Sequence, residues 1–126
     1  RYDIIKEKEQ RYEAHDIEDA DIIVTAYGTT SRVVESAVKT VRAEGLKVGV
    51  IRPITLWPFP EKIFSKAADT AKAFLSVEMS MGQMVEDVKI AVNGKADVHF
   101  FGRTGGIIPT PQEIAEEIRK IAGGLR

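Results

Sequence analysis

Four segments of the sequence combine a charged or amide side chain with glycines, hydroxyls or methionines, and their residue types could support recognition or chemistry. In the first, Gly28 and Thr29 precede Arg32 within the run GTTSR. A helix beginning there would offer backbone amides and a guanidinium to an anion such as a phosphate. The run lacks the G-x-G-x-x-G and G-x-x-x-x-G-K-[ST] patterns of nucleotide sites, so an ordinary helix-capping turn is the simpler interpretation.

The second segment places Glu78 and Gln83 around a cluster of methionines, in the run EMSMGQM. Methionine side chains pack adaptably against partners, so a carboxylate beside them suggests a contact surface. An equally good interpretation is that Glu78 accepts hydrogen bonds from backbone amides of the helix that follows. Both interpretations stay open at the level of the sequence.

Two arginines complete the set. Arg103 lies in the glycine-rich run GRTGG, where a guanidinium could pair with a carboxylate or a phosphate, although a tight structural turn is the default interpretation. Arg52 precedes residues 53–60, which hold three of the five prolines and the only tryptophan. The candidates for contact with a partner or an anion are therefore Gly28, Thr29, Arg32, Arg52, Glu78, Gln83 and Arg103.

No residues at catalytic or metal-binding spacing stand beside these candidates. The sequence contains no cysteine, which excludes disulfides, thiolate nucleophiles and Cys-ligated zinc or iron–sulfur sites within this chain. His15 and His99 are far apart in the sequence, and the serines lack the G-x-S-x-G pattern of hydrolases. We therefore expect no catalytic residue and no metal ligand here, and we expect the isolated chain to be inactive.

The composition is that of an ordinary globular domain. The chain has 126 residues, of which 44% are hydrophobic and 29% charged, and its formal net charge is −1. Such a balance, without clustered Lys and Arg, does not favour a nucleic-acid partner. No apolar run approaches the roughly 18 residues of a membrane span, so we expect no membrane association and a cytoplasmic location.

An alternation of apolar runs with helical patterns must position the four segments. Residues 21–27, 47–52, 73–78 and 97–101 are predicted strands, and helices are predicted at 30–45, 60–71, 82–92 and from 110 onward. Connections that carry a helix join parallel strands, so we predict an α/β fold, a three-layer open sandwich around a mostly parallel sheet of four to five strands. All four segments would then lie at the carboxyl edge of the sheet, where α/β proteins bind ligands.

Local signals support two of these helices in detail. Positions 34, 37, 38 and 41 form an apolar stripe in the first helix, with Gly45 as its C-cap. Before the last helix, Thr110 is placed to cap, Pro111 to occupy the first position and Glu113 to reach back to the cap. Positions 114, 118, 121 and 125 form the buried stripe of that helix.

The first residues differ from the rest of the chain. Residues 1–18 are rich in charged helix formers, so we predict a helical linker from a missing preceding domain, followed by the α/β domain at residues 19–126. The chain begins with Arg1 and not with Met, which suggests a fragment of a longer protein.

Taken in order, four motifs resemble the C-terminal domain of the alpha subunit of 2-oxoacid:ferredoxin oxidoreductases, in particular the 2-ketoisovalerate and 2-oxoglutarate types. They are AYGTTSR at residues 26–32, RPITLWPFP at 52–60, VEMSMGQM at 77–84 and GRTGGIIPTP at 102–111. The resemblance extends from about residue 19 to residue 122. Ser80 departs from the asparagine of many relatives, so the substrate subclass stays open.

The resemblance implies a transketolase C-terminal-domain-like fold, a mixed sheet in which one edge strand runs antiparallel. It also implies an assembly and active-site-supporting role in an enzyme that decarboxylates a 2-oxoacid oxidatively to acyl-CoA and reduces ferredoxin. Thiamine diphosphate, magnesium and an iron–sulfur cluster are implied for the complete enzyme and none for this chain. The implied partners are the preceding alpha-subunit domain, a thiamine-binding beta subunit, other subunits of the complex and, indirectly, ferredoxin.

Two other functions stay open from the sequence. The chain could be a small-molecule binding module for coenzyme A or another anion, held at helix N-termini with Arg32 or Arg103 nearby. It could also be the C-terminal domain of the beta subunit of a 2-oxoacid dehydrogenase. The motifs at residues 82–84 and 102–111 favour the ferredoxin-linked enzymes over this last alternative.

Overall fold

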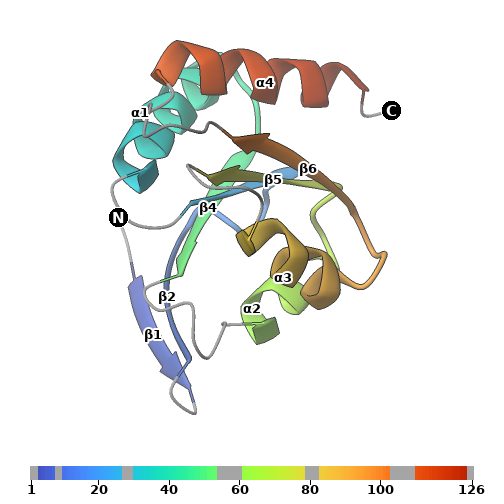
Figure 1. Cartoon of the computed structure of the whole chain (residues 1–126). Coiled ribbons are helices and arrows are strands. Elements are labelled where there is room, and N and C mark those ends of the chain that lie inside the picture. The colour runs from blue at the N-terminus through green and yellow to red at the C-terminus, as the bar shows by residue number, and fades with distance from the viewer. Residues whose placement is uncertain are drawn as a thin grey trace.

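The structure is a computed structural model, and it describes residues 3–7, 10–26, 30–53, 61–78, 83–102 and 110–124. Within these residues, strands and helices alternate after an opening pair of strands (Figure 1). The elements are β1 (Asp3–Glu7), β2 (Gln10–His15), β3 (Ile22–Ala26), α1 (Thr30–Ala43), β4 (Val48–Pro53), α2 (Glu61–Ala67), β5 (Ala73–Glu78), α3 (Gln83–Val92), β6 (Asp97–Gly102) and α4 (Pro111–Gly124).

The strands form one sheet in the order β1-β2-β4-β3-β5-β6. The pairs β3–β4, β3–β5 and β5–β6 are parallel, whereas β2 is antiparallel to both β1 and β4. The predicted mostly parallel α/β sheet is therefore confirmed. A single strand runs against the others, but this strand, β2, lies one position inside the edge, and the described sheet has six strands where four to five were predicted.

The predicted helix over residues 1–18 is wrong, because residues 3–7 and 10–15 form the strands β1 and β2. The pairing of β2 with β4 explains the difference, since it places His15 opposite Val50 and Glu13 opposite Arg52. A tertiary contact between residues far apart in the sequence thus overrides the local helix propensity of Lys, Glu and Gln.

Two apolar cores lie on opposite faces of the sheet. Helices α1 and α4 cover a face whose buried strand residues include Val24, Val50 and Leu75. Helices α2 and α3 cover the other face, over Ile51 and Phe74. Figure 1 shows the two helix pairs on opposite sides, so the predicted three-layer arrangement is confirmed. All predicted stripe positions of α1 and α4 are buried except position 125, which lies outside the described residues.

Both predicted helix ends have the expected geometry. Gly45 has a φ of 98°, and the amides of Gly45 and Leu46 donate to the carbonyls of Arg42 and Val41, the two bonds of a Schellman C-cap. At the start of α4, the Thr110 amide donates to Glu113 Oε1 over 2.9 Å, and the Glu113 amide donates to Thr110 Oγ1 over 3.2 Å. These reciprocal bonds are a capping box and fix where α4 begins.

The segment that connects β2 to β3 has to pass over β4, because β4 lies between these two strands in the sheet. Asp16 makes the turn with a φ of 57°, a left-handed conformation that aspartate tolerates better than most residues. A Cβ atom at Gly49 would lie 2.6 Å from the Asp16 carbonyl oxygen and 3.0 Å from that of His15. The crossing therefore requires the hydrogen side chain of glycine at position 49.

Candidate functional site

The carboxyl ends of the four parallel strands lie together at one edge of the sheet. The register pairs Ala26 of β3 with Val77 of β5, and Glu78 of β5 with Gly102 of β6. It also pairs Thr25 of β3 with Ile51 of β4. The strands therefore end within about two residues of one another, as the sequence predicts, and the ends of β3, β4, β5 and β6 define this edge (Figure 1).

Two candidate arginines have described side chains. Arg32 lies in the first turn of α1 and is exposed. Arg52 is the penultimate residue of β4 and is half-buried, with its Nε atom fully buried. Because side chains alternate along a strand, Arg52 lies on the same face as Val50, the face that α1 covers.

The backbones of two further candidates are described without their side chains. Glu78 is the last residue of β5, and Gln83 is the first residue of α3. Both positions therefore lie at the carboxyl edge of the sheet, where the sequence places them. Gly28, Thr29 and Arg103 lie outside the described residues.

A pair of buried hydroxyl residues, which the sequence analysis missed, lies just beneath this edge. Thr25 of β3 and Ser76 of β5 are register partners, and both are completely buried. By alternation with Ile23 and Phe74, they face the side that α2 and α3 cover. Among the described residues, Thr25 Oγ1 has no hydrogen-bond partner. A signal was present in the sequence, because each hydroxyl residue is the fourth residue of its strand and follows three apolar residues.

A second feature lies beside the edge, along the flank of α1. A groove of about 480 Å³ runs between this flank and the strands β2 and β4. The described residues that line it are His15, Arg32, Glu35, Ser36, Val38, Lys39, Arg42 and Val50. The sequence analysis set His15 aside as a linker residue, and its part in this groove follows from the unforeseen strand β2.

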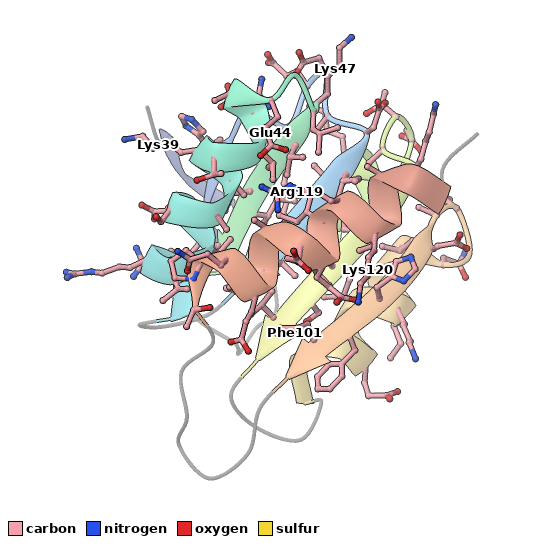
Figure 2. The ribbon with its side chains drawn as sticks, turned by 90° about the horizontal axis from the view of Figure 1, so that it is seen from above. Lys39, Glu44, Lys47, Phe101, Arg119 and Lys120 are labelled. Atoms are coloured by element: carbon pink, nitrogen blue, oxygen red, sulfur yellow. The ribbon has the colours of Figure 1, made fainter. Side chains whose placement is uncertain are left out.

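An ion pair joins the two helices of the α1/α4 layer. Arg119 of α4 donates from Nε to Glu44 Oε1 over 3.0 Å and from Nη2 to Glu44 Oε2 over 2.5 Å. Figure 2 shows the two side chains pointing toward each other between the helices. The hydrogen bond from Arg119 lowers the pKa of the Glu44 carboxyl, desolvation opposes this effect, and the charge of Arg119 adds to it. The same bond raises the pKa of Arg119.

The donor atoms of the described residues do not fit a metal or cluster site. The sequence has no cysteine to ligate an iron–sulfur cluster. Among the described residues, no three His, Asp or Glu side chains are grouped so that they could hold a metal ion. No described helix is long and apolar enough to cross a membrane. The chemistry that the described edge offers is thus hydrogen bonding and pairing of charges.

Comparison with known proteins supplies the context of this domain. The chain is 49% identical over 123 residues to the ketoisovalerate oxidoreductase subunit VorB of Methanothermobacter marburgensis. That match covers 98% of this chain but 35% of the relative, so the chain spans about a third of the length of the relative.

Two solved structures share the fold. A 2-oxoglutarate:ferredoxin oxidoreductase from Magnetococcus marinus, with 2-oxoglutarate, coenzyme A and succinyl-CoA bound, matches with a TM-score of 0.71 and 25% identity over 86% of this chain and 19% of its own. A split-gene transketolase, described as an inactive beta4 tetramer, matches with a TM-score of 0.73 over 100% of this chain and 42% of its own. Its 18% identity supports the fold alone.

The family match covers most of the folded part. Residues 20–114 match the family described as pyruvate:ferredoxin oxidoreductase core domain II, a range that includes every strand of the parallel sheet and all four candidate segments. The chain belongs to the pyruvate:ferredoxin oxidoreductase core domain II family.

Proposed function

We propose that this chain is the C-terminal, assembly and active-site-supporting domain of the alpha subunit of a thiamine-diphosphate-dependent 2-oxoacid:ferredoxin oxidoreductase. The enzyme would convert a 2-oxoacid oxidatively to an acyl-CoA and reduce ferredoxin. A branched substrate such as 2-ketoisovalerate is the first candidate. The observation that carries the proposal is the 49% identity to a ketoisovalerate oxidoreductase subunit along nearly the whole chain.

The residues of the domain support a contact role more than a chemical one. Iron–sulfur clusters would be held by other subunits, since this chain has no cysteine. Thiamine diphosphate and magnesium would be held by other domains, since no three His, Asp or Glu side chains of the described residues are grouped to hold a metal ion. The carboxyl edge would instead provide Glu78, Gln83 and Arg103 to the preceding domain and to the thiamine-binding beta subunit. The half-buried Arg52 would hold this edge in place. By this proposal, the chain is inactive without its partners.

The test compares single variants in the complete enzyme, assembled from the full-length subunits. Glu78→Ala and Arg103→Ala are each expected to reduce 2-oxoacid-dependent reduction of ferredoxin, or retention of the partner subunits, by tenfold or more, since a lost charge-assisted contact costs about 1.5–3 kcal/mol. Glu86→Ala and Lys120→Ala alter exposed charges on α3 and α4 and are the matched controls. Circular dichroism of the chain with each variant separates a lost contact from a lost fold.

Three outcomes would each contradict a different part of the proposal. Unfolding of the chain by both variants would make Glu78 and Arg103 structural residues. Normal assembly and turnover with both variants would remove the contact role of the edge. Oxidation of 2-oxoacids by the isolated chain would refute the supporting role altogether.

The rival function, binding of coenzyme A or another anion by the domain itself, is supported by the exposed Arg32 in the first turn of α1. Thermal unfolding with coenzyme A, phosphate and nucleotides distinguishes it. A ligand at 100 times its dissociation constant stabilises a protein by about 2.7 kcal/mol, which is readily measured. The assembly role predicts no shift of this size for the isolated chain.

A further inference from the structure

The groove along α1 has a distinct construction. One wall is the outer flank of α1, which contributes Arg32, Glu35, Ser36 and Lys39. The opposite side comes from β2 and β4, where His15 and Val50 are register partners and therefore face the same side of the sheet. Figure 2 shows Lys39 leaving α1 on the side away from α4. The groove shares Arg32 with the first candidate segment, and its other described lining residues come from α1, β2 and β4.

The charge of the lining is unbalanced. Three cations, Arg32, Lys39 and Arg42, face a single carboxylate, that of Glu35. Arg42 is engaged within the domain, because its Nε lies 3.7 Å from Asp16 Oδ2 and its Nη1 donates to the carbonyl of Val48. Across the part of the chain that the structure describes, no ion pair is formed by Arg32 or Lys39, and both are exposed. Two cations are therefore available to a ligand.

The spacing of these two cations restricts the ligand. Arg32 and Lys39 are seven residues apart on one helix, which corresponds to about 10 Å along the axis at a rise of about 1.5 Å per residue. Side chains that start this far apart along the helix can each pair with a separate anionic group. An extended polypeptide advances about 3.3 Å per residue, so two of its carboxylates a few residues apart match the spacing.

Of the eight described residues that line the groove, six are polar or charged, and the two valines, Val38 and Val50, are buried. Pairing of charges with the free cations is therefore the recognition that these described side chains offer.

We propose that the groove binds an extended acidic segment of a partner polypeptide, with one carboxylate on Arg32 and a second on Lys39. Arg42, which forms an ion pair with Asp16, follows Lys39 along α1 and is the last of the three cations that line the groove. Glu35 lies between the two free cations in the helix and repels a carboxylate at the intermediate position. The groove therefore selects segments whose acidic residues are separated by neutral ones.

The test measures binding of a fluorescein-labelled peptide with two glutamates separated by two neutral residues, by anisotropy at low ionic strength. The double variant Arg32→Gln/Lys39→Gln is expected to weaken binding about tenfold, since each exposed charge pair is worth up to about 1 kcal/mol. Glu35→Gln is expected to leave this affinity within about twofold and to tighten binding of an all-glutamate peptide about threefold. The control is Lys62→Gln/Lys120→Gln, which removes the same charge from α2 and α4.

Arg32, Lys39, Lys62 and Lys120 are exposed and Glu35 is half-buried, so the variants are expected to keep the fold, and circular dichroism verifies this. Equal weakening by the groove variant and the control would mean non-specific attraction and would overturn the proposal. Displacement of the peptide by inorganic pyrophosphate at a lower concentration would assign the groove to small phosphates and would also overturn it. The assay involves no turnover and none of Glu78, Gln83 and Arg103, so its failure leaves the proposed enzyme role unaffected.

Discussion

Substitution of Gly49 by alanine tests the close crossing between β2 and β3. The added Cβ would lie 2.6 Å from the carbonyl oxygen of Asp16, whereas ordinary contact begins at 3.4 Å, so the crossing backbone would have to retreat by about 0.8 Å. The atoms that block it are backbone atoms of Asp16 and His15, which cannot rotate away. Asp16 has little room to adjust, because it already adopts a φ of 57°.

The magnitude follows from two opposing effects. Overpacking of this kind lowers the free energy of unfolding by about 1–3 kcal/mol. The smaller conformational entropy of the unfolded alanine chain raises it by about 0.5–1 kcal/mol. We expect Gly49→Ala to lower the free energy of unfolding by about 1–2 kcal/mol. With an unfolding entropy of about 2.1 cal/mol/K per residue, the melting temperature should fall by roughly 4–8 °C.

Urea and thermal unfolding, followed by circular dichroism, measure this change. Gly123→Ala is the matched control, because Gly123 lies in the last turn of α4 with no atom within 4 Å of an added Cβ. That control should gain up to about 1 kcal/mol from helix propensity. A Gly49→Ala protein as stable as the wild type would refute the claim that the crossing depends on glycine.

Three further changes test other parts of the fold. Thr110→Ala removes the capping box and should cost about 1 kcal/mol in urea unfolding, with no comparable loss for Gln112→Ala. Glu44→Gln removes the pair with Arg119. Since the folded pKa of Glu44 lies below its usual 4.5, the wild type should exceed this variant in stability above pH 4.5, and the difference should vanish as the pH falls through the folded pKa. Thr25→Val replaces an unpartnered buried hydroxyl by a methyl group and should stabilise the chain by about 1 kcal/mol, so a clear loss would indicate a hidden partner for Oγ1.

Much of the fold could be predicted from the sequence because its signals are local. The stripes of α1 and α4, the Gly45 cap and the capping box at Thr110 each depend on residues within one or two turns. The location of the candidate segments was predictable for a related reason, since parallel strands with helical connections place their carboxyl ends at a common edge.

The hairpin β1–β2 could not be predicted in this way. Its charged sequence has the composition of a solvated helix, and such charges are also typical of exposed edge strands. Only the contact of β2 with β4, between positions such as His15 and Val50, distinguishes the two structures. The groove depends on the same contact and therefore could not be predicted from the sequence either.

The strand order also constrains the order in which the chain can complete its sheet during synthesis. The central strand β3 takes its neighbours from β4 and β5, and both are made after it. Until Glu78 has been synthesised, β3 retains an open edge, although all five of its residues are buried in the finished domain. A nascent or truncated chain that ends between residues 54 and 72 therefore presents an apolar strand with one unpaired edge. Chains stopped in this interval should be the most prone to aggregation and the most dependent on chaperones.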